Sequence, residues 1–254
     1  MRFCVISPCA GLQKFSTLTK THLLLSHVSN PIYWNFYRQR SDEGDLVILD
    51  NGAYEGKLDE GLLILRMAEV HPKVVILPDL VGAEPELSYH ISLKFWNKFR
   101  DRIPSSIDWM YVPQMHDGTG EALDTMFYFL EKAVNFMDLK FVGLPRIFAT
   151  NFHCRRASLV RLIKRRMPQV HVHALGMAAG SLQELQELAD NECDSIDSSA
   201  PVWRGWNGHA LKEGRDPQWD AVGTEVDWDV HPGTLTVENE NLIKENLRKV
   251  GVKC

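Results

Sequence analysis

The sequence predicts an α/β fold, and within that class a (β/α)₈ TIM-like barrel, regular or irregular, in a single domain over residues 1–254 without a zinc subdomain. Short apolar or β-branched runs alternate along the chain with segments whose apolar residues have helical spacing. The runs are too uniformly apolar for strands with one face in solvent, so both faces of the sheet should be covered. Seven such runs in the length of one domain favour a barrel over an open doubly wound sheet.

The element order follows from these patterns. Strands are predicted at residues 2–7, 45–50, 73–79, 108–114, 139–145, 170–176 and 193–197. Helices are predicted at 59–70, 85–99, 121–137, 157–167 and 181–189, with a closing helix at 238–250. An eighth strand is placed around 221–230, unless the barrel is irregular. Residues 198–235 should form a long irregular segment rich in tryptophan, and such loops in compact domains are usually functional.

Composition excludes some classes of protein. The formal net charge of −5 does not fit a uniformly basic nucleic-acid-binding protein. No apolar run approaches the ~20 residues that span a bilayer, and the N-terminus lacks the apolar core of a signal peptide. The five cysteines are scattered, without disulfide-scaffold or Cys-x-x-Cys spacing. We therefore expect a cytoplasmic protein with no membrane partner.

One segment is strongly basic. The run RRASLVRLIKRR at 155–166 contains six cations and no acid: Arg155, Arg156, Arg161, Lys164, Arg165 and Arg166. These side chains could form a solvated helix face. Alternatively, they could contact the phosphates of a nucleic acid, which supply the sequence-independent part of such binding. The sequence leaves both interpretations open.

Polar side chains stand where several predicted strands end. Asp50, Asp79, Gln114 and Asp197 each follow or close an apolar run. Taken singly, each could serve a turn or a helix cap. In a barrel, however, the carboxyl ends of all strands meet at one face, where the chemistry of such folds is found. The four residues are therefore predicted to converge on one rim, and Asp194 should point the opposite way from Asp197 because strand side chains alternate.

Two histidines suggest a metal-dependent alternative. His171 and His173 lie two residues apart in a predicted strand, a spacing that some barrel metallohydrolases use. Asp50, Asp79 or His116 could complete a set of ligands. The sequence has no strong metal-ligand spacing, however, so our leading expectation is that the protein needs no metal or other cofactor.

Five short segments, taken together in their order along the sequence, are similar to those of a known protein family. They are LDNGAYEG (49–56), ILPDLVG (76–82), VPQMHDG (112–118), VGLPR (142–146), and ALGM followed by SLQELQELADNECDSIDSSAPVWR. In this order they resemble the strand ends of the tRNA-guanine transglycosylase superfamily. The resemblance implies that Asp197 is the nucleophile and Asp50 the general acid/base. It also implies a base-binding set, with side chains or backbone contributed by Asp79, Gln114, Gly143, Leu144, Tyr54 and Met177.

The differences between this sequence and the tRNA enzymes indicate which branch of the superfamily it resembles. The tRNA enzymes are longer and carry a Cys-x-Cys-x-x-Cys…His zinc site, which this sequence lacks, and Pro145 and Arg146 stand where they have a Glu that senses the 7-substituent of the base. The chain is therefore most similar to the small zinc-free 7-deazaguanine DNA transglycosylases that bacteriophages often encode. That likeness implies exchange of guanine in DNA for a base such as 7-cyano-7-deazaguanine, in the host cytoplasm if the protein is phage-encoded. The implied partners are single-stranded or flipped-out DNA, the free base, and enzymes that synthesise or further modify it.

The implied mechanism has a covalent intermediate. Asp197 would attack C1′ of deoxyguanosine, and Asp50 would deprotonate the incoming base so that it displaces Asp197. Trp203 and Trp206 could stack on a neighbouring base, while Arg204 and the basic helix hold phosphates. The alternatives are a divergent tRNA-guanine transglycosylase, a metal-dependent TIM-barrel hydrolase, and a non-catalytic nucleic-acid-binding protein.

Overall fold

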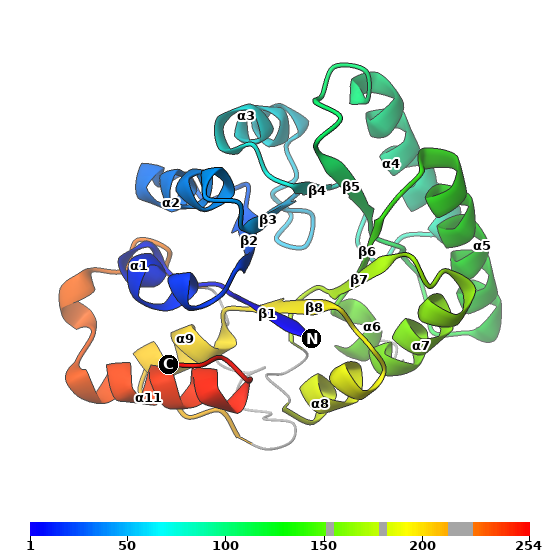
Figure 1. Ribbon diagram of the computed structural model, residues 1–254. Coiled ribbons are helices and arrows are strands. Elements are labelled where there is room, and N and C mark those ends of the chain that lie inside the picture. The colour runs from blue at the N-terminus through cyan, green and yellow to red at the C-terminus, as the bar shows by residue number, and fades with distance from the viewer. Residues whose placement is uncertain (151–154, 178–181, 213–225) are drawn as a thin grey trace.

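The computed structural model describes residues 1–150, 155–177, 182–212 and 226–254. Eight parallel strands form one sheet in the order β1-β8-β7-β6-β5-β4-β3-β2, and β1 lies against β2, so the sheet is a nearly closed barrel (Figure 1). The predicted TIM-like barrel is therefore confirmed. The strands are β1 (Arg2–Val5), β2 (Thr21–Leu25), β3 (Leu46–Asp50), β4 (Val74–Ile76), β5 (Asp108–Tyr111), β6 (Phe141–Leu144), β7 (His171–Ala174) and β8 (Ser195–Ser198).

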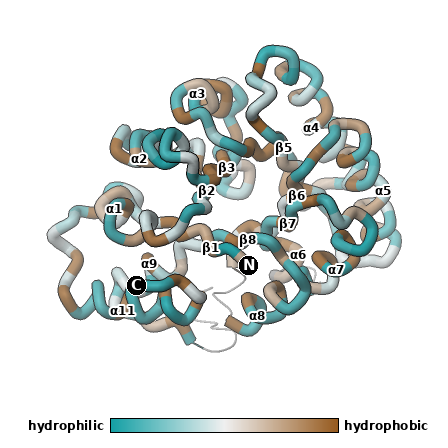
Figure 2. The backbone as a smooth tube through the Cα atoms, in the orientation of Figure 1, coloured by the Kyte–Doolittle hydropathy of each residue, from teal (hydrophilic) through white to brown (hydrophobic). Residues whose placement is uncertain are grey.

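Helices surround the strands on the outside of the barrel (Figure 1). In Figure 2, helices such as α2, α5 and α11 alternate hydrophobic and hydrophilic segments, as expected of helices with one buried face. Several begin at a polar side chain that accepts a bond from a first-turn N–H, for example Asp59 before α3 and Thr119 before α5. The helices are α1 (Leu12–Phe15), α2 (Pro31–Asp42), α3 (Glu60–Val70), α4 (Pro85–Phe99), α5 (Gly120–Met137), α6 (Ile147–Thr150), α7 (Arg156–Arg166), α8 (Leu182–Asp190), α9 (Ala200–Trp206) and α11 (Val237–Lys249), with 3₁₀ turns at Cys9–Gly11, Ser16–Leu18 and Pro232–Thr234.

The eighth strand is β2 and not the predicted segment around 221–230, so that prediction is wrong. All five residues of β2 are buried. Its register with β3 pairs Thr21 with Leu46 and Leu25 with Asp50. Of the segment predicted as a strand, residues 221–225 lie outside the described residues, and 226–230 form no strand. The THLLL run is interrupted by a polar residue, His22, which faces outward toward α2 and lies 3.1 Å from Asp45.

Part of the tryptophan-rich segment is regular, which also corrects the prediction for 198–235. Residues Ala200–Trp206 form α9, which packs on the C-terminal helix α11. The two backbones approach closely at Gly205, where a Cβ would lie 2.8 Å from the Ile243 Cα. Only glycine fits at position 205, so the close packing of α9 on α11 depends on this residue. Residues 213–225 of the segment lie outside the described residues.

A buried guanidinium joins the outer helices to the strand ends. Arg156, the first residue of α7, is 1% exposed. Its Nε and Nη2 donate to the two carboxylate oxygens of Glu184 in α8, at 2.8 and 2.9 Å. Its Nη1 and Nη2 also donate to the carbonyls of Leu144, Leu175 and Gly176, at 3.3, 2.9 and 2.7 Å. Arg156 therefore cannot contact a nucleic acid from this position, and that prediction is wrong.

We expect Arg156→Met to lower the free energy of unfolding by about 3–5 kcal/mol, because it leaves the partly buried Glu184 carboxylate without this partner and removes three bonds to backbone carbonyls. Arg165→Met is the matched control, since Arg165 lies on the same helix but is exposed, and it should change stability by less than about 0.5 kcal/mol. Urea unfolding followed by circular dichroism measures both. Equal losses in the two variants would contradict a structural role specific to Arg156.

Candidate active site

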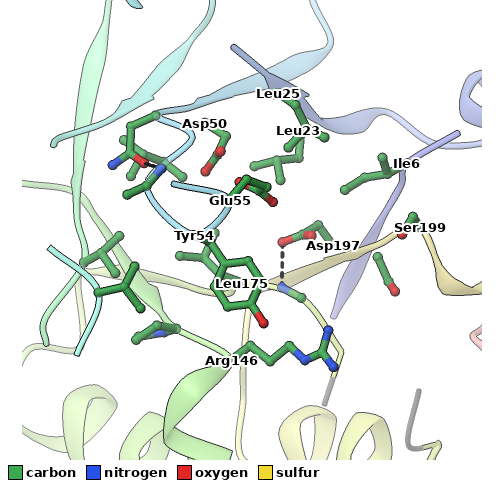
Figure 3. Close-up of a pocket in the computed structure, with 18 of the residues that line it drawn as sticks. Ile6, Leu23, Leu25, Asp50, Tyr54, Glu55, Arg146, Leu175, Asp197 and Ser199 are labelled. Atoms are coloured by element: carbon green, nitrogen blue, oxygen red, sulfur yellow. Dashed lines mark hydrogen bonds between the residues drawn. The ribbon is translucent and has the colours of Figure 1, made fainter. Parts of the chain in front are cut away.

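A cavity of about 480 Å³ opens at the carboxyl ends of the strands. Asp50 at the end of β3, Asp79 after β4, Gln114 after β5 and Asp197 in β8 all line it. Figure 3 shows Asp50 and Asp197 turned into this space together with Tyr54 and other side chains. The structure thus brings the four strand-end residues together, as the pattern of strand ends predicts. Asp194 points outward, where it accepts from Lys164 and from the Val172 N–H.

Asp197 is held by two donors on one oxygen. Its Oδ1 accepts from the Gly176 N–H and from His173 Nε2, both at 3.0 Å, and the first of these bonds is drawn in Figure 3. Gly176 has φ of +68°, so the loop after β7 turns there in a conformation that favours glycine. The carboxylate is 5% exposed and lies beside the cavity. Its orientation is therefore fixed by the fold.

Asp50 belongs to a group of interacting acids. Its Oδ2 accepts from the Gly52 N–H at 2.8 Å. Burial raises the pKa of Asp50 well above its usual range, and the charges of Glu55, Asp197 and Asp79 raise it further. Burial and the charge of Asp197 also raise the pKa of Glu55. A carboxyl of raised pKa inside a cavity has the properties of a general acid/base.

Asp79 is part of a buried carboxylate–amide group. Its Oδ1 accepts from Asn51 Nδ2 at 2.7 Å, and its Oδ2 from Gln114 Nε2 at 2.6 Å. Gln114 Oε1 is in turn fixed by the Gly82 N–H at 3.1 Å, and Asn51 also donates to the Leu77 carbonyl. Burial raises the pKa of Asp79 to about 6, although the two amide bonds act in the opposite direction. Each carboxylate oxygen keeps a lone pair for a ligand N–H.

The remaining residues implied for base binding divide into two pairs. Tyr54 and Met177 line the cavity, Tyr54 with 58% of its surface exposed and Met177 almost fully buried. Gly143 and Leu144 are buried and are not among the residues of the cavity wall, which Pro145 and Arg146 form instead. A Cβ at Gly143 would lie 3.0 Å from side chains inside the barrel, those of Leu175, Met110 and Val112. Close packing of the barrel interior therefore accounts for that glycine.

Most of the basic helix lies away from the cavity. Lys164 in the last turn of α7 donates to the carbonyl of Val170, which precedes β7, and pairs with Asp194, which precedes β8. The last turn therefore lies at the amino ends of the strands, opposite the cavity, and this corrects the predicted phosphate role of Lys164, Arg165 and Arg166 at the site. Arg165 and Arg166 are exposed there. Arg166 pairs with Glu131 at 2.9 Å.

Two of the three predicted nucleic-acid residues in α9 are also buried. Arg204 is 4% exposed and Trp206 is 5% exposed, with the Trp206 indole N–H donating to Thr234 Oγ1 at 2.9 Å. Neither can stack on a base or bind a phosphate from this position, so both predictions are wrong. Trp203 is half-buried against the core. Arg161 on α7 and Arg155, which directly precedes this helix at its end nearer the cavity, are exposed.

The two histidines of β7 are bonded within the barrel. Both bind Ser195 Oγ at 2.7 Å, His171 through Nε2 and His173 through Nδ1. His116, the other suggested ligand, lies beside Glu84 and Asp117. Within the described part of the chain, no group of three or more His, Cys, Asp or Glu side chains has an arrangement that could hold a metal ion.

Sequence reasoning missed several residues of this site. Asn51 and Glu55 lie within the quoted LDNGAYEG segment, but a spacing argument assigned them no role. Lys57 and Arg146 also line the cavity and bring positive charge to it. The sequence does contain a feature that could have predicted Glu55 as a site residue. An acid five residues after a strand-end Asp, in a tight Gly-containing loop, can turn back toward that Asp.

The fold and the cavity define the protein as a TIM-like barrel with an acidic site at the carboxyl ends of its strands. The sequence matches none of the known family models, and a search of curated proteins also finds no match. No helix in the described residues is long and apolar enough to span a bilayer.

The raised pKa of Asp79 predicts how the stability of the fold depends on pH. A carboxyl whose pKa is 3.8 in the unfolded chain and about 6 in the fold stabilises the protein below pH 4, and this stabilisation is lost as the pH rises through 6. Between pH 4 and 7 the free energy of unfolding of the wild type should therefore fall by about 3 kcal/mol relative to Asp79→Asn. Urea unfolding of both proteins at several pH values measures this. Parallel curves would show that Asp79 ionises normally.

Proposed function

We propose that the protein is a base-exchange transglycosylase that replaces guanine in DNA with a 7-deazaguanine such as 7-cyano-7-deazaguanine. One observation carries this proposal. A single cavity contains a carboxylate held by two donors, Asp197, a second carboxyl of raised pKa, Asp50, and the separate carboxylate–amide group of Asp79 and Gln114. These are the parts required for attack at an anomeric carbon, proton transfer and recognition of a purine edge.

The reaction has two displacements at C1′ of the target nucleotide. In the first, an Asp197 oxygen bonds to C1′ through an oxocarbenium-like transition state while the C1′–N9 bond breaks, and the leaving guanine takes a proton from Asp50. In the second, Asp50 removes the N9 proton of the incoming deazaguanine. The new N9–C1′ bond then forms as Asp197 leaves as a carboxylate. Two displacements retain the configuration at C1′.

The Asp79 group supports recognition of guanine and its analogues. Guanine presents the N1–H and the 2-amino group as neighbouring donors, and an ionised carboxylate accepts both. Asn51 and Gln114 hold Asp79 in place from either side. Tyr54 and Met177 line the same cavity and supply surfaces against which the face of the base can pack.

The size of the cavity also supports a nucleotide flipped out of its helix. A volume of about 480 Å³ is within the range of small-ligand sites. A guanine inside a duplex cannot reach such a cavity, so the substrate must be single-stranded or the base must be flipped out, at a cost of a few kcal/mol. We expect Lys57 and Arg146 in the cavity wall, with exposed Arg155 at the end of α7 nearer the cavity, to meet the sugar–phosphate backbone.

The test is transfer of 7-cyano-7-deazaguanine into DNA and tRNA in parallel, followed by digestion and mass spectrometry of the nucleosides. We expect the deazaguanine nucleoside from DNA only. Asp197→Asn should abolish it, and Asp50→Asn should slow it by about 10²–10⁴-fold, the usual contribution of a general acid/base. Asp124→Asn, an exposed acid on α5, is the matched control and should exchange bases at the wild-type rate.

Each other outcome has a definite meaning. Exchange in tRNA alone would make the protein a tRNA enzyme with the same chemistry. Full activity in Asp197→Asn would reject the covalent mechanism. Absence of exchange in both polymers, with folded protein and several 7-substituted bases, would reject the proposed function.

The proposed role of Asp79 also predicts a pH dependence of base binding. Only the ionised carboxylate accepts from the two guanine donors, and the pKa of Asp79 is about 6. The dissociation constant of the free base should therefore be about tenfold higher at pH 5 than at pH 7. Isothermal titration of the Asp197→Asn variant measures binding without turnover. An affinity unchanged across this range would separate Asp79 from the base.

A further inference from the structure

A continuous chain of hydrogen bonds leads from Asp197 into the barrel. His173 Nε2 donates to Asp197 Oδ1 at 3.0 Å, His173 Nδ1 lies 2.7 Å from Ser195 Oγ, and this oxygen lies 2.7 Å from His171 Nε2. The four residues alternate on two adjacent parallel strands, β7 and β8, in a register that places His173 opposite Ser195. Their side chains therefore share the inner face of the barrel.

Burial determines how the protons are arranged in this chain. His173 and Ser195 are fully buried. An ionised Asp197 only accepts, so His173 carries its proton on Nε2 and accepts on Nδ1 from the Ser195 hydroxyl. Ser195 Oγ then accepts from His171 Nε2–H. Burial lowers the pKa of His171 to about 4, so this histidine is neutral at pH 7 and fits that arrangement.

The charged groups around these four residues do not change the direction of the hydrogen bonds between them. The negative charge of Asp194 raises the pKa of His171, while His173, Arg2 and Lys164 lower it. Cys4, which pairs in register with Asp197 across β1 and β8, is fully buried, and burial and the charge of Asp197 raise the pKa of its thiol. Cys4 therefore remains a neutral neighbour of the carboxylate.

Both donors to Asp197 reach the same oxygen, which gives the two oxygens different roles. Oδ1 accepts from His173 and from Gly176, whereas no described residue donates to Oδ2. Oδ2 is thus the atom available for attack. When an ester on Oδ2 later breaks, negative charge returns to a carboxylate that already has two fixed N–H donors, and donors positioned in advance stabilise developing charge most effectively.

We infer that His173 is a positioning residue for Asp197, and that Ser195 and His171 set its tautomer so that Nε2–H always faces the carboxylate. This inference rests on the proposed function for its catalytic consequence, but the tautomer itself does not depend on the reaction. In this arrangement the histidines of β7 orient a nucleophile, a role distinct from the metal-ligand role considered from sequence.

The experiment compares three substitutions among the hydrogen-bonded residues with one substitution elsewhere in the barrel. His173→Leu removes the donor, and we expect kcat for base exchange to fall by about 100-fold while KM for the free base stays within about twofold, because misplacing a reacting group costs rate and Asp79 still binds the base. His173→Gln keeps an N–H at the Nε2 position and should retain kcat within about tenfold of the wild type. Ser195→Ala should give an intermediate loss. His22→Gln disrupts a buried His–Asp pair on the outer face of β2 and should leave kcat unchanged.

A second measurement separates this inference from the proposed function. In ¹⁵N-histidine-labelled protein, NMR should show His173 protonated on Nε2 at pH 7, with a signal that shifts in Asp197→Asn and in Ser195→Ala. Protonation of neutral His173 on Nδ1 would overturn the inference, as would a folded His173→Leu variant with kcat within threefold of wild type. If His173→Leu does not fold, rescue by His173→Gln and the NMR signal decide. If the wild type exchanges no base, the proposed function fails. The tautomer of His173 alone then decides whether the hydrogen bonds from Asp197 to His171 are arranged as inferred.

Discussion

The buried guanidinium of Arg156 is the interaction on which the site depends. It binds Glu184 of α8 and the carbonyls at the ends of β6 and β7, including that of Gly176. The N–H of Gly176 is one of the two donors to Asp197. One cation therefore joins two outer helices, two strand ends and the loop that orients the candidate nucleophile. Five satisfied donors offset the cost of burying its charge, whereas an unpaired guanidinium at this depth would be strongly destabilising.

The site concentrates acids that a stable fold would otherwise keep apart. Asp50, Glu55, Asp79 and Asp197 line one cavity, and burial raises the pKa of the first three. Repulsion by neighbouring acids adds to this effect at Asp50 and Glu55. The protein separates them by their hydrogen bonds. Asp197 and Asp79 each have two side-chain or backbone donors, while Asp50 has one backbone donor. Differences in environment of this kind are what the proposed roles of nucleophile, base reader and proton carrier require of chemically equal carboxyls.

The sequence predicts the fold class and the polar rim because both depend on local patterns. Alternation of apolar runs locates seven strands, and residues at strand ends must meet in a parallel barrel. What it misses depends on long-range pairing. The strand β2 contains His22, whose partner Asp45 is 23 residues away, so the sequence around it does not look like a buried strand. The basic pattern at 155–166 likewise cannot distinguish Arg156, enclosed by Glu184 and three carbonyls, from exposed Arg165. His171 and His173 were placed correctly on one face, but only the structure shows that Ser195 joins them.

The sign of the charge in the cavity bears on how a nucleic acid would approach it. Four acids repel phosphate, so the sugar–phosphate backbone is disfavoured inside the cavity while an uncharged base is not. Lys57 and Arg146 in the wall offset part of that negative charge. Since the last turn of α7 lies at the opposite end of the barrel, the backbone contacts of a bound polymer must come from the rim around the cavity. Electrostatics therefore favours entry of the base alone, which is the geometry that the proposed attack of Asp197 on C1′ requires.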